Sequence, residues 1–227
     1  MNGPVDVVLS GGFLAFAEQA GFLKALEDLE IPVAAVCGTS SGALAGSLWA
    51  AGMPAHEVFR RLTEKSPLRQ VRPSARPWRG LLSMRPVVRE LTADLPRAFD
   101  DLAVPFGAGV IDALSVPHLL TSGPLPEAVA ASCAIPGLFG PVWIGGQPWA
   151  DGGVVDRTAL PAWRRLRPER PVLMHWVESS VGMEPDAAEH LTVVRSPAAG
   201  AAFWDLGDVH ARFARTREQT RRALGAT

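Results

Sequence analysis

Apolar residues along the first 65 positions occur in two kinds of run that differ in length. Two short runs are apolar almost throughout, as in strands that are buried on both faces of a sheet. Three longer stretches have the length and composition of helices, and the first carries its apolar side chains on one face. The strands are expected at residues 5–9 and 33–37, and the helices at residues 16–30, 42–51 and 55–65. Because strands and helices alternate, the pattern predicts an α/β fold with a parallel sheet and right-handed crossovers.

The rest of the chain continues this alternation with one interruption. Residues 66–90 contain six Arg and four Pro, and this composition indicates a cap or linker over the core. The arginines of the last helix are expected on a solvated face. Overall we expect a single domain over residues 1–227, with the Pro/Arg-rich cap or linker at about 66–90. Further strands are expected at residues 106–114, 141–144, 171–177 and 191–194, and the last helix at residues 205–224.

Composition and charge narrow the class of protein. The chain has 227 residues, of which 48% are hydrophobic, so it can bury a sizeable core. Its formal net charge of -1 favours neither nucleic acid nor an acidic partner. Cys37 and Cys133 lie in apolar stretches and are expected to be buried and unpaired. No signal peptide or membrane-spanning run is predicted, so the expected location is the cytoplasm. The five histidines lack ligand spacing, and no metal or cofactor is expected.

The sequence Gly38-Thr39-Ser40-Ser41-Gly42 lies between the second predicted strand and a helix. It has the G-x-S-x-G pattern of a nucleophile elbow, a sharp turn that exposes the serine hydroxyl. The two glycines allow the helix to pack close to the strand, and the helix N-terminus favours negative charge nearby. Ser40 is therefore a candidate nucleophile, although a plain Gly/Ser loop can have the same sequence.

A second glycine turn, Ser10-Gly11-Gly12, follows the first predicted strand. Because neighbouring parallel strands end at the same edge of a sheet, this turn is expected beside Ser40. The backbone N–H groups of Gly11, Gly12 and Phe13 are then candidate oxyanion donors for acyl transfer. The apolar residues after the turn fit either a pocket for an acyl chain or ordinary core packing.

Histidine is one candidate for the general base that a serine nucleophile requires. His175, His190 and His210 all follow Ser40 in the chain, as the triad histidine does in α/β-hydrolases. That family places several strands before its nucleophile, whereas a single strand is expected here. A histidine triad stays open as an alternative.

A carboxylate is the other candidate base. Asp151 follows a strand-like stretch, and Gly152 and Gly153 after it allow this loop to approach Ser40 closely. A carboxylate is a weak base, so burial must raise its pKa for this role. An Asp-Gly turn without a chemical role has the same sequence.

Taken in order, several stretches resemble the patatin-like phospholipase family. "LSGG" with "GFLKALEDLEI" resembles its oxyanion loop and first helix, and "GTSSGALAG" its nucleophile elbow. "GLLSMRPVVREL" (80–91) resembles the segment leading to its middle helix, "AVAASCAIPGLFGPV" (128–142) the stretch before its acid, and "DGG" (151–153) the acid motif. The resemblance implies a three-layer α/β sandwich with a mostly parallel central sheet flanked by helices. It also implies a Ser40–Asp151 dyad that hydrolyses lipid acyl esters through an acyl-enzyme, with neither metal nor catalytic histidine.

Two stretches depart from the family pattern. Its loop is usually Gly-Gly-Gly-x-Arg-Gly, and here Phe13 stands at the third Gly, Ala15 at the Arg and Phe16 at the last Gly. The missing Arg removes a fixed positive charge, and Phe13 is strained if the loop needs a positive φ there. After the acid motif, "VVDRTALP" replaces the usual early Asn and Pro. A catalytically weak or inactive lipid-binding protein on the same fold is therefore the second alternative.

The expected partner is a lipid or acyl-ester substrate, as the resemblance implies. The Pro/Arg-rich segment bears on how such a substrate is reached, because Arg attracts anionic headgroups and Trp favours a membrane boundary. Trp78, Leu81 and Leu82 lie within it. A solvated cap over the site is the favoured reading, and a peripheral membrane contact stays open.

Overall fold

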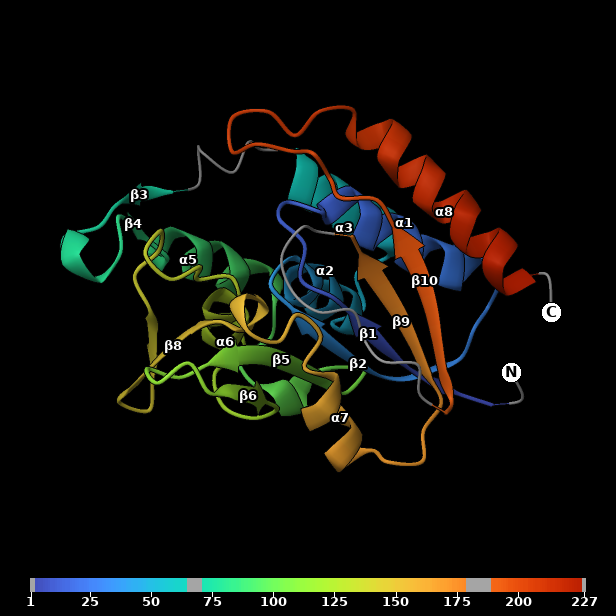
Figure 1. Ribbon diagram of the computed structural model, residues 1–227, viewed down its shortest axis with the longest axis horizontal. Coiled ribbons are helices and arrows are strands. Elements are labelled where there is room, and N and C mark those ends of the chain that lie inside the picture. Colours follow the sequence, from blue (N-terminus) through green and yellow to red (C-terminus); the bar gives the residue numbers. More distant parts are fainter. Residues whose placement is uncertain (1–2, 65–70, 179–188, 226–227) are drawn as a thin grey trace.

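The computed structural model describes residues 3–64, 71–178 and 189–225. Within these residues eight strands form one central sheet, and helices pack around it (Figure 1). The strand order is β10-β9-β1-β2-β5-β8-β7, with β6 also paired to β5. The strands are β1 (Val5–Leu9), β2 (Val33–Thr39), β5 (Phe106–Ile111), β6 (Pro117–Leu120), β7 (Val142–Ile144), β8 (Gln147–Asp151), β9 (Val172–Val177) and β10 (Leu191–Ser196).

The sheet is mostly parallel, as expected. Strands β10, β9, β1, β2 and β5 pair in parallel, whereas β6, β7 and β8 are antiparallel. Strand β5 pairs with β2 through residues 106–109 and with β8 through residues 110–111. The antiparallel pair thus begins where the pairing with β2 has ended, which brings the end of β8 close to the end of β2.

Helices cover both faces of the sheet, but unequally. Alternate residues of β1 belong to different clusters: Val7 and Leu9 to the main core, and Val8 to a smaller one. The smaller cluster contains Trp163 of α7 (Leu160–Leu166). The three-layer α/β class is therefore confirmed, with one thick and one thin helical layer. The main core includes residues of α1 (Phe16–Asp28), α2 (Ser41–Ala50), α3 (Ala55–Thr63), α5 (Arg85–Asp94), α6 (Leu125–Ser132) and α8 (Val209–Gly225).

Every strand and helix expected from the apolar runs is present, with bounds that differ by a few residues. Several elements that the pattern did not predict are also present, and besides β3 (Arg72–Pro73), β4 (Leu82–Ser83) and α5 they include the strands β6 and β8 and the helices α6 and α7. Both helices are short and carry a proline in their first turn, Pro126 and Pro161. Proline is well tolerated at that position but reads as a breaker in a sequence pattern. Strand β8 contains Pro148, and a proline argues against a strand in a sequence pattern in the same way.

The arginines of α8 are less solvated than expected. Helix α8 packs along α1, where a Cβ on Gly21 would lie 2.5 Å from the backbone oxygen of Phe213. Arg212 pairs with Glu18 at 3.3 Å, and the carboxyl of Glu18 is itself buried. The expectation of a purely solvated face is therefore wrong, because part of this face docks the last helix onto the core.

The Pro/Arg-rich segment is described from residue 71 onward, and residues 66–70 of the expected cap lie outside the described residues. Strands β3 (Arg72–Pro73) and β4 (Leu82–Ser83) form a small hairpin beside α5 (Figure 1). Its tip exposes Trp78, and Arg79 lies 5.6 Å from the ring of Trp143. The solvated cap stays the favoured prediction for this segment, with a peripheral membrane contact as the open alternative.

Candidate active site

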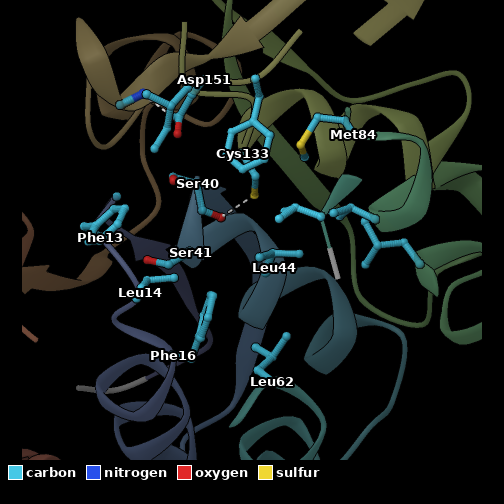
Figure 2. Close-up of a pocket in the computed structure, with 18 of the residues that line it drawn as sticks. Phe13, Leu14, Phe16, Ser40, Ser41, Leu44, Leu62, Met84, Cys133 and Asp151 are labelled. Carbon is cyan, nitrogen blue, oxygen red and sulfur yellow. Dashed lines mark hydrogen bonds between the residues drawn. The ribbon is translucent and has the colours of Figure 1, made fainter. Parts of the chain in front are cut away.

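Ser40 lies at a strained turn between β2 and α2. Strand β2 ends at Thr39, helix α2 begins at Ser41, and Ser40 between them has φ 53° and ψ -121°. A positive φ is unfavourable for a residue with a side chain, and such strain is concentrated at functional sites. The turn projects the Ser40 side chain into a cavity at the N-terminus of α2 (Figure 2). The positive end of the helix dipole therefore lies behind its oxygen.

The two glycines of the elbow permit this close approach of helix and strand. A Cβ on Gly42 would lie 2.3 Å from the backbone oxygen of Leu9, and a Cβ on Gly38 would lie 2.4 Å from that of Gly42. No side chain fits at either distance without displacing backbone. The spacing of these glycines is thus a packing requirement of the turn.

Two residues outside the elbow hold it in place, and sequence reasoning gave them no role. The Ser40 N–H donates to the Ser132 hydroxyl at 2.9 Å, and that hydroxyl donates to the Gly109 carbonyl at 2.6 Å. The Cys133 thiol contacts the Ser40 carbonyl oxygen at 3.3 Å. Both side chains belong to the stretch "AVAASCAIPGLFGPV", which was the available signal. This stretch therefore stabilises the backbone of the turn that carries Ser40.

Asp151 ends strand β8 and lines the same cavity as Ser40 (Figure 2). Its side chain is 3% exposed, and its Oδ1 accepts the Gly153 N–H at 2.7 Å. Burial raises the pKa of the Asp151 carboxyl to about 6, against the opposing effects of hydrogen bonds from the Ser40 hydroxyl and the Gly153 N–H. A Cβ on Gly152 would lie 2.8 Å from the Gly109 backbone, so this glycine lets the acid loop reach the sheet.

The three N–H groups expected to form an oxyanion hole differ in availability. The Gly11 N–H donates to the backbone oxygen of Arg157 at 2.6 Å, so it is not free to bind an oxyanion. In the described parts of the chain, the N–H groups of Gly12 and Phe13 have no hydrogen-bond partner. The positive φ of this loop occurs at Leu14 (53°) rather than at Phe13. The strain expected at Phe13 is therefore absent, and Gly12 and Phe13 remain as candidate donors.

Arg157 is a further residue of this site that the sequence did not identify. Its guanidinium donates to the Gly11 carbonyl through Nη2 at 2.6 Å and Nε at 3.2 Å, and to the Val177 carbonyl through Nη2 at 2.6 Å. The only available signal was the departure "VVDRTALP" from the family pattern. An arginine is thus placed against the oxyanion loop from a distant part of the chain.

The cavity beside Ser40 and Asp151 is predominantly apolar. It has a volume of about 400 Å³, which falls in the usual range for small-molecule sites. Figure 2 shows apolar side chains of α1, α2 and the segment before α5 around it. The Phe13 ring is half exposed and contacts the Phe203 ring edge-to-face, with centroids 5.1 Å apart. The apolar lining includes Leu14, Phe16, Leu44, Leu48, Leu62, Met84, Val87, Leu91, Ile135 and Phe139.

The histidine triad is not supported, because no histidine lines this cavity within the described residues. His175 is fully buried in β9, where its ring nitrogens contact Gln19 and Ser196 at 2.8 Å. Burial lowers the pKa of His175 to about 3, so it stays neutral. His190 and His210 are exposed elsewhere. The α/β-hydrolase alternative is therefore wrong in its choice of base.

Neither a metal cluster nor a membrane-spanning helix is found in the described residues. No three His, Cys, Asp or Glu side chains there are grouped closely enough to bind a metal ion. No helix there combines the length and the apolar character that a bilayer crossing requires. Cys37 and Cys133 are both free thiols, and burial raises the pKa of each.

The sequence of this chain is similar to one family model and to several known proteins. The family model described as "Patatin-like phospholipase" matches residues 7–163. An uncharacterized NTE family protein of Mycobacterium tuberculosis is 30% identical over 190 residues, which cover 81% of this chain and 51% of that protein. A protein named lysophospholipase nte1 of Aspergillus terreus is 29% identical over 174 residues, covering 71% of this chain and 11% of that protein.

Solved structures agree on the fold. VipD from Legionella pneumophila matches with a TM-score of 0.59 and 13% identity, over 98% of this chain and 67% of that chain. An identity this low supports the fold alone. The chain spans about half the length of the mycobacterial relative, so relatives of this kind contain further sequence beyond the matched part.

Proposed function

Because this chain belongs to the patatin-like phospholipase family, we propose that it hydrolyses acyl esters of lipids with Ser40 as nucleophile and Asp151 as general base. One observation carries the proposal: a half-buried serine in a strained turn and a buried aspartate with a raised pKa line the same mostly apolar cavity. The proposal places no third residue between them, because the Ser40 hydroxyl lies near enough to the Asp151 carboxyl to lower its pKa.

The reaction proceeds in two halves. Ser40 Oγ attacks the ester carbonyl carbon while Asp151 accepts its proton, and the resulting oxyanion is bound by the N–H groups of Gly12 and Phe13. The tetrahedral intermediate then breaks its bond to the alcohol, which takes the proton from Asp151 and leaves. A water molecule attacks the acyl-enzyme in the same way, with Asp151 again accepting the proton. The fatty acid is released, and Ser40 regains its hydrogen.

The substrate class follows from the shape and polarity of the cavity. Its walls are mostly apolar, so they favour an acyl chain over a polar group, although the ion-paired side chains of Arg61, Glu90 and Asp94 also line it. The Aspergillus relative is named a lysophospholipase. We propose lysophospholipids and other single-chain esters as the first substrates to examine.

The direct test is covalent labelling with a fluorophosphonate probe, which reacts with activated serines and needs no knowledge of the substrate. We expect one modification per chain, mapped by mass spectrometry to Ser40. Heat-denatured protein should not react, because the hydroxyl is activated only by the folded site. Labelling of another serine, or none in a folded protein that hydrolyses esters, would contradict the role of Ser40.

The half-exposed Phe13 ring at the cavity and the committed Gly11 N–H favour a second candidate, a lipid-binding protein without turnover. It predicts binding of fluorescent fatty acids with neither probe labelling nor ester hydrolysis. The same labelling experiment therefore separates the two functions.

Activity should depend on pH through the Asp151 carboxyl. The base must be ionised to accept a proton, and burial raises its pKa to about 6. We expect kcat/KM to rise about tenfold per pH unit below that value and to level off above it. A pH profile measured from 4 to 9 with a soluble short-chain ester checks this. A plateau that extends unchanged down to pH 4.5 would contradict a base in this environment.

A further inference from the structure

The Arg157 guanidinium is buried without a carboxylate partner. Its side chain belongs to a residue that is 7% exposed, and it lies on the Trp176 ring at 4.4 Å from the centroid. No ion pair involves it within the described residues, and its Nη1 has no hydrogen-bond partner there. A buried cation without a counter-ion is expensive for the fold. Stability therefore does not explain its place, and a role in the neighbouring site does.

Both polar backbone groups of Gly11 are bound by this one residue. The Gly11 N–H donates to the Arg157 backbone oxygen, and the Gly11 carbonyl accepts two bonds from the Arg157 guanidinium. A Cβ on Gly11 would lie 3.6 Å from the Cβ of Ser40, so the clamped backbone is directly beside the nucleophile. Arg157 thus fixes the loop at its point of closest approach to the nucleophile.

The peptide geometry transmits this contact to the candidate oxyanion donor. The Gly11 carbonyl and the Gly12 N–H belong to the same peptide unit, and no cis peptide occurs among the described residues. In a trans peptide these two groups point in opposite directions. A guanidinium that binds the Gly11 carbonyl oxygen therefore sets the direction of the Gly12 N–H. Its positive charge also polarises the unit and strengthens that N–H as a donor.

We propose that Arg157 is a positioning residue for the oxyanion hole, which orients and polarises the Gly11–Gly12 peptide so that the Gly12 N–H binds the oxyanion. The inference rests on the proposed hydrolase function. It also accounts for the loss of an arginine from the loop itself, where Ala15 stands. The positive charge is supplied through space by the segment after the acid motif.

Kinetics of Arg157→Gln and Arg157→Lys test this role. Gln can still donate one hydrogen bond but carries no charge, and Lys keeps the charge but lacks the two-nitrogen fork. Because the oxyanion contact is made in the transition state, we expect kcat to fall about 100-fold for Gln and about 10-fold for Lys, with KM changed less than about 3-fold. Guanidinium ion added to Arg157→Ala at non-denaturing concentration should restore part of kcat, since this residue lines the cavity.

Arg167 provides the matched control. It also lies on a tryptophan ring, that of Trp163 at 5.7 Å, and it binds the buried Asp6 at 2.6 Å, but it does not line the cavity. Arg167→Gln is expected to lower the melting temperature without changing kcat. If folded Arg157 variants keep the wild-type kcat, or if Arg167→Gln lowers kcat equally, the inference is overturned.

A second readout does not depend on activity. Amide hydrogen exchange of isotope-labelled glycine reports the Gly11 N–H, which is protected by its bond to Arg157. We expect exchange at Gly11 to accelerate at least about tenfold in Arg157→Gln and not in Arg167→Gln, since loss of the clamp frees the loop. Unchanged exchange would overturn the positioning role. If the wild-type protein fails to label or hydrolyse, the proposed function fails separately, and this comparison still decides whether Arg157 holds the loop.

Discussion

Replacing Ser40 by alanine is expected to reduce ester hydrolysis by about 10⁴-fold or more, because it removes the hydroxyl on which the acyl-enzyme is proposed to form. The change removes one oxygen atom from a turn that is held by backbone contacts, namely the Ser40 N–H to Ser132 and the packing of Gly42 against Leu9. The fold should therefore survive. The measurement is kcat/KM with a soluble ester, together with a lysophospholipid assay and a melting curve.

Ser47→Ala is the control for the loss of a serine from helix α2. The Ser47 hydroxyl is bonded within its own helix, to the Leu44 carbonyl at 3.2 Å, and its residue is fully buried away from the cavity. We expect its activity to stay within about 3-fold of wild type, as for most changes that touch no reacting group. Substantial hydrolysis by a folded Ser40→Ala protein would remove Ser40 from the mechanism.

Replacing Asp151 by asparagine should reduce kcat by about 10³–10⁴-fold, since the amide has the shape of the carboxyl but cannot accept a proton. The bond from the Gly153 N–H can be kept by the amide oxygen, so the loop geometry should persist. Residual activity should lose its dependence on a group that titrates near pH 6. Asp112→Asn, in the turn between β5 and β6 and outside the cavity lining, is the control and should retain activity.

Asp151→Asn should be more stable than the wild-type protein at neutral pH. The pKa of Asp151 is raised from 3.8 to about 6 on folding, so the folded state holds a proton that the unfolded chain has already lost. The protonated Asp151 carboxyl makes its full contribution to the free energy of unfolding below about pH 4, and this contribution is lost as the pH rises through 6. The ionised carboxylate then costs roughly 3 kcal/mol, and Asp151→Asn should melt a few degrees higher at pH 8. A lower melting temperature there would contradict the burial argument.

The residues of the candidate site could be picked out from short motifs, because each motif reflects a local requirement of the backbone. The pattern G-x-S-x-G specifies Ser40, since a Cβ at Gly42 would lie 2.3 Å from the Leu9 backbone oxygen and would prevent α2 from packing against the end of β1. The DGG motif specifies Asp151 for a similar reason, because Gly152 must lie against the Gly109 backbone. Such constraints are visible in sequence as fixed glycine spacing, whatever the rest of the chain does.

Arg157, Ser132 and Cys133 could not be predicted in the same way. Each acts on a partner far away in the sequence: Arg157 on Gly11, 146 residues away, and Ser132 on Ser40, 92 residues away. The unusual stretch "VVDRTALP" marks the segment around Arg157 but does not show which residue the arginine contacts. Its role depends on how β8, the acid loop and β9 are arranged around the first strand, and that arrangement is a property of the whole sheet.

The contacts between β1 and β9 also determine when, during synthesis of the chain, the proposed active site can form. The Val177 N–H donates to the Ser10 hydroxyl at 2.9 Å, and the Val177 carbonyl accepts from Arg157. During synthesis the Ser40 turn is made before β9, but the candidate oxyanion loop cannot take its final shape until residue 177 has been synthesised and β9 has paired with β1. Pairing of segments so distant in sequence is slow and comes late in folding. An incomplete chain is therefore expected to lack the proposed activity, which requires the finished sheet.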